Sequence, residues 1–392
     1  MKPMKKILGL LLALCLIAGC TSAFAAGIPV EQVKIGYITI GDENEGYSAN
    51  HLNGLKEAQA ALGISDDQVL CKYNVPETED AYEAAIDLAE QGCNIIFATS
   101  FGHESYVFQA AAEYPNIQFC HATGTAAMSS PLNNVHNYFY AVYESRYVSG
   151  VVAGMKLAQM IEDGTITADA AKIGYVGAFP FAEVISGFTS FFLGARSQCP
   201  SVTMEVRYTN SWGDMALEKE TAEALIADGC VLISQHADTT GAPSACEAAG
   251  VPCVGYNISM LPVAPSTALT SAAGDWGAYV PYAVKCLIDG EEIARDWCKG
   301  YAEGAVYTTE LNDSIVAPGT AEKVAELEEA FKAGTVKVFD TSAFTVNGET
   351  LTSYTTAYGL EGTEMVSDGY FHESEMRSAP YFDLDIDGIT TK

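Results

Sequence analysis

Aromatic and carboxylate side chains recur in short polar loops that follow strand-like runs of this 392-residue chain. The loops span residues 41–48, 99–103, 178–181, 210–214, 235–241, 256–257 and 275–277. Their aromatic residues are Tyr47, Phe101, Phe179, Phe181, Trp212, Tyr256 and Trp276, and none of the loops contains Lys or Arg. A site for a phosphate or carboxylate ligand needs a cation or a glycine-rich cradle. These loops therefore favour a flat, neutral or weakly basic ligand, held by stacking worth about 1–3 kcal/mol per ring.

Two carboxylates in these loops are suited to accept hydrogen bonds from ring N–H or amine groups, namely Asp42 and Asp238. Asp238 has a second interpretation, as the cap of a helix that starts near Ala242. Trp212 and Trp276 likewise either face a ligand or pack in the core near a hinge. The sequence leaves these alternatives open.

The sequence lacks the frames that catalysis, metal binding or phosphate binding require. His236 lies two positions from Asp238, but there is no G-x-S-x-G nucleophile frame beside them. No C-x-x-C pair or Cys/His zinc spacing occurs. Neither G-x-x-x-x-G-K-[ST] nor G-x-G-x-x-G is present. We expect no catalytic residue, no metal and no cofactor.

An internal repeat indicates which elements position these loops. Residues Lys34–Ile38 (KIGYI) return as Lys172–Val176 (KIGYV), and Glu90–Ile96 returns as Ala227–Ile233, at nearly the same offset. The repeated unit is too long for a solenoid repeat. It indicates two copies of one α/β half that face each other across a ligand cleft.

Hydrophobic periodicity gives the elements of both copies. Strands are expected at 33–40, 69–75, 95–98, 173–176, 202–208, 231–234, 252–256 and 268–271, and helices at 49–62, 80–90, 143–161, 183–197, 215–227, 277–288 and 320–334. Alternating strands and helices predict parallel sheets with helices on both faces. Ligands then bind at the carboxyl ends of the strands, where the aromatic loops lie.

The first residues are typical of an exported lipoprotein. Lys2, Lys5 and Lys6 precede an apolar run at 7–18, which is too short to span a bilayer. Ile17–Cys20 then fits a lipobox, so we expect Cys20 to be lipidated and the protein to lie on the extracytoplasmic face of the cell membrane. Cleavage at Ala23–Ala25 is the alternative. The formal charge of −30 argues against nucleic acid as a partner.

Many short motifs resemble the basic membrane protein (BMP) family of substrate-binding lipoproteins, over about residues 32–335. They are Ile96–Gly102, Ala112–Pro115, His121–Gly124, Glu144–Tyr147, Gly150–Met155, Ala178–Pro180, Leu193–Arg196, Thr209–Trp212, Gln235–His236, Gly255–Asn257 and Trp276–Gly277. The resemblance implies a type I periplasmic-binding-protein fold that serves an ABC importer. It also implies a purine base or nucleoside as the ligand, or riboflavin in one branch.

By that likeness the ligand-binding residues are Tyr47, Ser100, Phe101, Phe179, Trp212, Asp238, Asn257 and Trp276. Three positions depart from the pattern of the family. Asn44 replaces a common Asp, Tyr47 replaces a usual Trp, and His103 replaces an aromatic or aliphatic residue. An altered ligand preference is therefore open.

The expected organisation has five parts. A signal peptide (1–19) and a linker (20–31) precede lobe 1 (32–142 plus 258–295), lobe 2 (143–257 plus 296–345) and a C-terminal extension (346–392), which we expect to be irregular. The expected partners are a small-molecule ligand, a membrane permease and a lipid anchor, and the chain is expected to be a monomer. The alternatives are an exported nucleoside-acting enzyme and a receptor that reports the ligand to a sensor.

Overall fold

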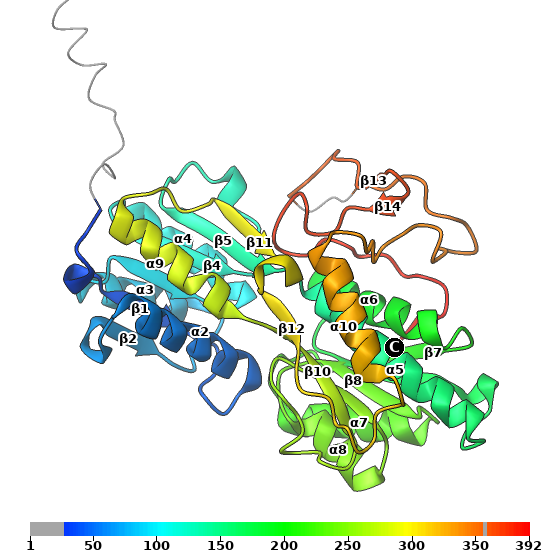
Figure 1. The fold of residues 1–392 in the computed structure, drawn as a ribbon. Coiled ribbons are helices and arrows are strands. Elements are labelled where there is room, and N and C mark those ends of the chain that lie inside the picture. The colour runs from blue at the N-terminus through cyan, green and yellow to red at the C-terminus, as the bar shows by residue number, and fades with distance from the viewer. Residues whose placement is uncertain (1–26, 356–358) are drawn as a thin grey trace, which may run out of the picture.

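Two parallel-stranded lobes are visible in this computed structural model, which describes residues 27–355 and 359–392 (Figure 1). Lobe 1 holds a sheet of order β2-β1-β3-β4-β5-β11. Its strands are β1 (Ile35–Ile38), β2 (Val69–Lys72), β3 (Ile95–Ala98), β4 (Gln118–Ala122), β5 (Val135–Tyr140) and β11 (Asp296–Lys299). Its helices are α2 (Gly46–Leu62), α3 (Glu79–Glu90), α4 (Glu104–Glu113) and α9 (Val280–Asp289).

Lobe 2 holds a sheet of order β12-β10-β9-β8-β6-β7-β15, parallel except for the pair β10 and β12. The strands are β6 (Lys172–Gly177), β7 (Thr203–Tyr208), β8 (Leu232–His236), β9 (Cys253–Tyr256), β10 (Ala268–Gly274), β12 (Val306–Thr308) and β15 (Ile389–Thr391). The helices are α5 (Val142–Glu162), α6 (Ala182–Gln198), α7 (Met215–Ala227), α8 (Gly241–Ala249) and α10 (Thr320–Lys332). The expected fold class of two parallel α/β lobes is confirmed.

The repeat corresponds to equivalent strands of the two sheets. β1 lies between β2 and β3, and β6 lies in the same way between β7 and β8. Every residue of β1 and β3 is buried, as expected for strands covered by helices on both faces. Asp214 caps α7 as its side chain accepts from the backbone N–H groups of Ala216 and Leu217.

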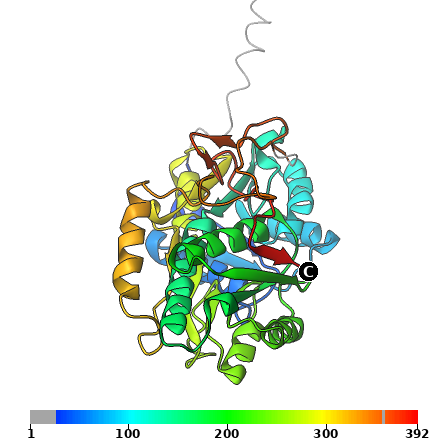
Figure 2. The ribbon, with the colours of Figure 1, turned by 90° about the vertical axis from the view of Figure 1, so that its right-hand side faces the viewer.

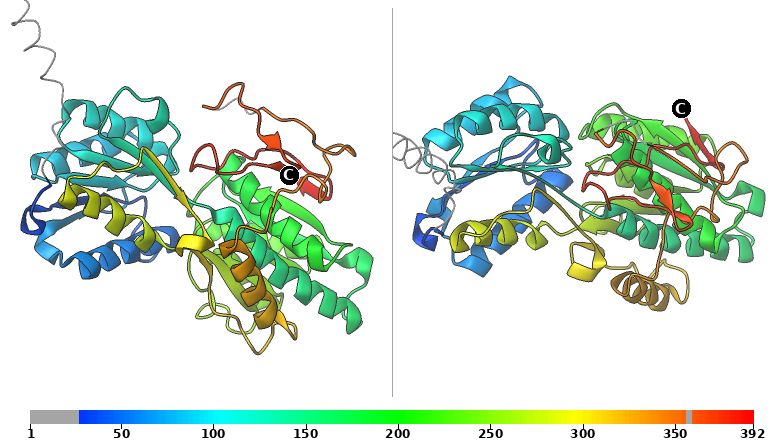
Figure 3. Two further views of the ribbon diagram at one scale, coloured as in Figure 1. Left: turned by 45° about the horizontal axis from the view of Figure 1, so that its top comes forward. Right: turned by 90° about the horizontal axis from the view of Figure 1, so that it is seen from above.

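Within the described residues the chain crosses between the lobes three times, near Ala141, Asp275 and Gly300 (Figure 3). The pairing of the strands moves the expected lobe boundaries. The sequence places residues 268–274 in lobe 1, but they form β10 beside β9 of lobe 2. It places residues 296–299 in lobe 2, but they form β11 beside β5 of lobe 1. Backbone pairing with a distant strand decides these positions, and the local sequence does not encode it.

Helices α5 and α6 pack closely because glycines line their contact. A Cβ added at Gly150 would lie 2.0 Å from the carbonyl oxygen of Phe191, and one at Gly154 would lie 2.3 Å from that of Ala195. Only glycine permits such a close backbone approach. The first helix after the crossover at Ala141 is thereby held firmly against lobe 2.

The C-terminal extension is more ordered than expected. Most of it lacks regular structure, but it contains a short hairpin of β13 (Val366–Ser367) and β14 (Tyr370–Phe371). Its final strand, β15, pairs in parallel with β7 at the edge of the lobe 2 sheet (Figure 2). A three-residue strand has no periodicity that a sequence pattern can detect.

Candidate ligand-binding site

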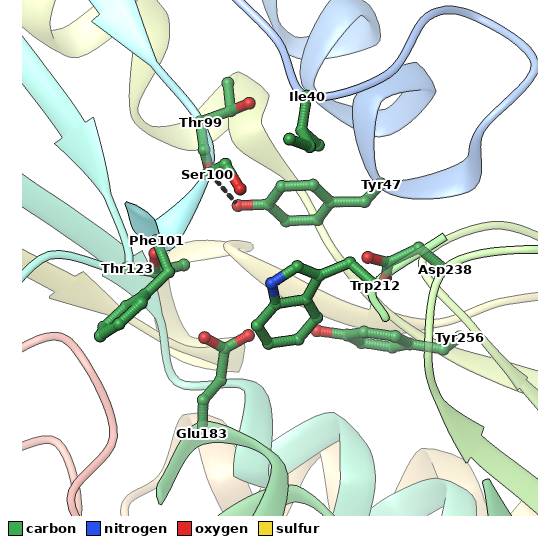
Figure 4. Close-up of a pocket in the computed structure, with 10 residues that line it drawn as sticks. All are labelled: Ile40, Tyr47, Thr99, Ser100, Phe101, Thr123, Glu183, Trp212, Asp238 and Tyr256. Atoms are coloured by element: carbon green, nitrogen blue, oxygen red, sulfur yellow. Dashed lines mark hydrogen bonds between the residues drawn. The ribbon is translucent and has the colours of Figure 1, made fainter. Parts of the chain in front are cut away.

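A small cavity lies between the lobes, where the strands of both sheets end. Lobe 1 lines it with Ile40, Tyr47, Thr99, Ser100, Phe101 and Thr123, and lobe 2 with Glu183, Trp212, Asp238 and Tyr256 (Figure 4). Its volume is about 20 Å³. The lobes are in contact beside the cavity, where the backbone N–H of Gly46 in lobe 1 donates to the carbonyl of Asp238 in lobe 2 at 3.1 Å. The arrangement is therefore closed, and we call this cavity the central cleft.

Tyr47 is held rigidly at the start of α2. The Glu45 carboxylate caps the helix and accepts from the backbone N–H groups of Tyr47 and Ser48 at 2.6 and 2.9 Å. The Tyr47 hydroxyl donates to the carbonyl of Thr99 at 2.7 Å, as Figure 4 shows. Both ends of this side chain are thus fixed, and its ring forms part of the cleft wall.

Ser100 and Phe101 follow β3 and belong to the same wall. The Ser100 hydroxyl donates to Glu77 at 2.6 Å, and the same carboxylate accepts from the backbone N–H of Gly102 at 2.7 Å. Because its proton is donated to Glu77, the Ser100 hydroxyl is left as a hydrogen-bond acceptor on the cleft wall. The ring of Phe101 lies 5.5 Å from that of Phe181 in lobe 2, so an aromatic contact spans the two lobes.

Phe179, Phe181 and Trp212 of lobe 2 form one aromatic cluster, and of these three residues Trp212 lines the central cleft. Phe179 and Phe181 stack at 5.1 Å, and Phe179 packs against Trp212 at 5.2 Å. Figure 4 shows the Trp212 indole in the middle of the lining residues. Phe179 packs against Trp212 and does not itself line the cavity.

Asp238 faces the cleft, and Asn257 orients it. The Asn257 amide donates to Asp238 at 2.8 Å, and Asn257 itself does not line the cavity. Burial holds the pKa of Asp238 well above its usual range, and the nearby carboxyls of Glu45 and Glu218 raise it further. The backbone of Asn257 is in the left-handed region (φ 64°), which asparagine tolerates better than most residues.

Trp276 does not line the cleft. Its side chain is fully buried in the main core, where it stacks on His51 at 4.0 Å and packs on Tyr140 at 4.3 Å. The structure thus matches the alternative interpretation of a core residue near the hinge. The physical reason is that the chain has already returned to lobe 1 at Asp275, so Trp276 enters the space beneath α2.

Two residues on the lobe 2 side, Glu183 and Arg146, are not among the site residues predicted from the sequence. Burial raises the pKa of Glu183, in the first turn of α6, to about 7, although Arg146 lowers it. Arg146 comes from α5, and its guanidinium carbon lies 3.6 Å from the ring centroid of Tyr256. Arg146 also donates to the carbonyl of Gln235 at 2.7 Å. Glu183 ends the 178–183 loop, and Arg146 belongs to the Glu144–Tyr147 motif, so both had a sequence signal.

The central cleft is an acidic and aromatic site. Asp238 and Glu183 face it, and the described residues that line it include no Lys or Arg. Its walls offer aromatic surfaces and hydrogen-bond acceptors, and in this closed arrangement its volume of about 20 Å³ has room for about one water molecule. Within the described part of the chain, no group of three or more His, Cys, Asp or Glu residues could hold a metal ion. In the same part of the chain, no helix is long and apolar enough to cross a membrane.

Two parallel-stranded lobes closed over an aromatic cleft define the architecture of a two-lobed solute-binding protein. A solute-binding protein of an ABC transporter from Aeropyrum pernix superimposes with a TM-score of 0.65 at 18% sequence identity, covering 78% of this chain and 93% of that one. The fold is thus the type I periplasmic-binding-protein fold expected from the sequence.

Residues 39–338 match the Bmp family model, described as ABC transporter substrate-binding protein PnrA-like. The chain therefore belongs to this family of substrate-binding proteins. A purine-binding protein of Brucella abortus is 33% identical over 79% of this chain and 83% of its own length. A putative ABC transporter glucose-binding protein of Haloferax volcanii is 30% identical over 80% of this chain and 76% of its own.

Proposed function

We propose that this ABC transporter substrate-binding protein captures a purine base or nucleoside between its lobes and presents it to a membrane permease without transforming it. The observation that carries the proposal is the wall of the central cleft. Tyr47 and Phe101 of lobe 1 and Trp212 of lobe 2 offer aromatic surfaces around the Asp238 carboxylate. A flat heterocycle with ring N–H or amine donors satisfies both features at once.

The closed arrangement supports capture by movement of the lobes. Contacts such as Phe101 with Phe181, and Asn50 with the carbonyl of Asn257 at 3.1 Å, join the lobes across the cleft. The ligand enters when these contacts open, and hinge closure buries it. The permease then recognises the closed form.

The proposed location follows from the lipobox. Cys20 lies outside the described residues, and we propose that its lipid anchors a monomeric protein on the extracytoplasmic face of the membrane. Metabolic labelling with a fatty acid tests the anchor, because a Cys20→Ser variant should lose both the label and its membrane association. If the variant kept the label, the anchor would lie elsewhere.

The ligand class is tested by native mass spectrometry of protein purified without refolding, followed by calorimetric titration. The panel is adenine, adenosine, guanosine, inosine, riboflavin and glucose. We expect binding of the purines and recovery of the ligand unchanged after long incubation. Glucose is included because the Haloferax relative is named for it. Binding of riboflavin or glucose alone would overturn the purine assignment, and turnover of a nucleoside would show an enzyme.

A further inference from the structure

The C-terminal extension connects the two lobes. In lobe 1, Asp296 of β11 accepts from the backbone N–H and the hydroxyl of Ser378, at 2.6 and 2.5 Å. In lobe 2, β15 pairs with β7, and Lys392 lies 2.9 Å from Glu205. The family match ends at residue 338, before this extension begins. Figure 1 shows the extension above lobe 2, reaching toward β11.

A second cavity of about 340 Å³ lies where the extension meets the cleft. Its walls include Phe101 and Thr123 of lobe 1, Pro180 and Glu183 of lobe 2, and Pro380 and Tyr381 of the extension. Phe101, Thr123 and Glu183 also line the central cleft, so the two cavities adjoin. We call the second cavity the outer compartment.

We propose that the outer compartment receives the hydroxylated group of a ligand whose flat ring lies in the central cleft. The C-terminal extension thereby becomes a specificity element that favours a nucleoside over the free base. This inference rests on the proposed function. A volume of 340 Å³ lies within the range of about 300–1,000 Å³ that is typical of small-molecule pockets.

Thr123 is the polar group that points most clearly to a ligand. Thr123 is 4% exposed, and its hydroxyl has no hydrogen-bond partner among the described residues. Its φ of 64° is unfavourable for a β-branched residue. Such a strained residue with an unpaired buried hydroxyl, at the junction of both cavities, suits a hydroxyl group of the ligand as its partner.

The charges of the outer compartment favour a neutral polyol over a phosphate. Glu183 and Asp383 contribute carboxylates, which accept from hydroxyl groups and repel a phosphate. Arg377 also lines the cavity, but its guanidinium donates to the carbonyls of Ala379 and Pro380, at 3.1 and 3.4 Å. Arg377 therefore shapes the loop of the extension.

The wall that the extension supplies is preformed. The Glu373 carboxylate accepts from the backbone N–H groups of Tyr381 and Phe382, at 3.1 and 2.9 Å. The Tyr381 hydroxyl accepts from the backbone N–H of Glu375 at 3.2 Å and donates to the carbonyl of His372. Because these bonds fix the loop before binding, little conformational entropy of the loop is lost when the ligand binds.

The test compares Ala379→Phe, which fills the outer compartment from the extension, with Thr352→Phe, a control at an exposed position of the same extension. Calorimetry measures the adenine, adenosine and adenosine monophosphate affinities of each folded variant and of the wild type. We expect Ala379→Phe to weaken adenosine binding about tenfold and to leave adenine binding within about twofold. Thr352→Phe should change neither, and the wild type should bind the monophosphate more weakly than adenosine.

A second variant guards against misfolding of the first. Thr123→Val keeps the shape of the side chain and removes its hydroxyl, and it should weaken adenosine binding more than adenine binding, although Thr123 also lines the central cleft. Equal losses for adenine and adenosine in both variants, or no loss in either, would overturn the inference and leave the proposed function standing. If the wild type bound no purine or nucleoside, the proposed function would fail, and the inference would fail with it.

Discussion

Trp212 and Trp276 have the same residue type and opposite environments. Trp212 lines the central cleft, and Trp276 is fully buried among His51 and Tyr140. We predict that Trp212→Ala weakens purine binding about tenfold to a hundredfold, because one stacking surface is lost. Trp276→Ala should instead lower the free energy of unfolding by about 3–5 kcal/mol, because it leaves a cavity.

Calorimetric titration and urea unfolding measure these two effects separately. Trp212→Phe is the matched control for the cleft, since it keeps an aromatic surface and should retain part of the affinity. If Trp276→Ala lost affinity at unchanged stability, the assignment of Trp276 to the core would be wrong.

Glu183 gives the protein a pH dependence with a defined sign. Its folded-state pKa of about 7 is raised above the ordinary value of 4.5. Its protonated form is therefore favoured in the folded state, so its contribution to stability is full below about pH 4.5 and is lost as the pH rises through 7. We predict that Glu183→Gln flattens the fall in unfolding free energy between these pH values. Urea unfolding at a series of pH values measures the free energy of unfolding as a function of pH. The same pH dependence in Glu183→Gln and in the wild type would contradict the prediction.

Most of the site residues could be predicted because parallel strands bring their carboxyl ends to one edge. The loops after β1, β3, β7 and β8 therefore place Tyr47, Ser100, Phe101, Trp212 and Asp238 around one cavity. Trp276 follows a strand end as well, but its position depends on where the chain crosses between lobes. Arg146 lies in the Glu144–Tyr147 motif, but its contact with Tyr256 joins α5 to a strand distant in the sequence, and the motif alone does not show that contact.

At the scale of elements, the contact between α5 and α6 leaves no room for a side chain at Gly150. We predict that Gly150→Ala lowers the free energy of unfolding by about 3 kcal/mol or more, since the new Cβ would meet the Phe191 carbonyl oxygen at 2.0 Å. Urea unfolding measures the effect. Gly213→Ala is a suitable control, because its nearest neighbour would lie at 3.7 Å and its stability should hardly change. Wild-type stability of Gly150→Ala would show that the helices can separate.

The elements themselves follow from sequence to different degrees. Long periodic segments such as the helix expected at 143–161 appear with nearly the same bounds, as α5 at Val142–Glu162. The strands β11 and β15 were not expected, because each is short. Each is a strand only through its pairing with a strand that is distant in the sequence, β5 for β11 and β7 for β15. Tertiary pairing decides such segments.

For the whole molecule, the bridge from Ser378 to Asp296 ties the extension to lobe 1. We predict that Asp296→Ala increases amide hydrogen exchange at residues 373–383 and leaves β15 protected, because β15 is held by lobe 2. Hydrogen exchange with mass spectrometry reads both segments in one experiment. Asp289→Ala, which removes the exposed partner of Lys285, is the control. Equal exchange in the two variants would show that the bridge does not hold the extension.

The pairing of β15 with β7 also affects how the chain folds during synthesis. β15 begins 181 residues after β7 ends, from residue 208 to residue 389. At about 5–20 residues per second, the ribosome needs roughly 10 to 40 s for this stretch. During that interval the outer edge of β7 stays unpaired, and its charged side chains Glu205 and Arg207 are the kind that discourage pairing with other chains. The order of translation thus leaves one edge of the nascent lobe 2 sheet open until β15 emerges.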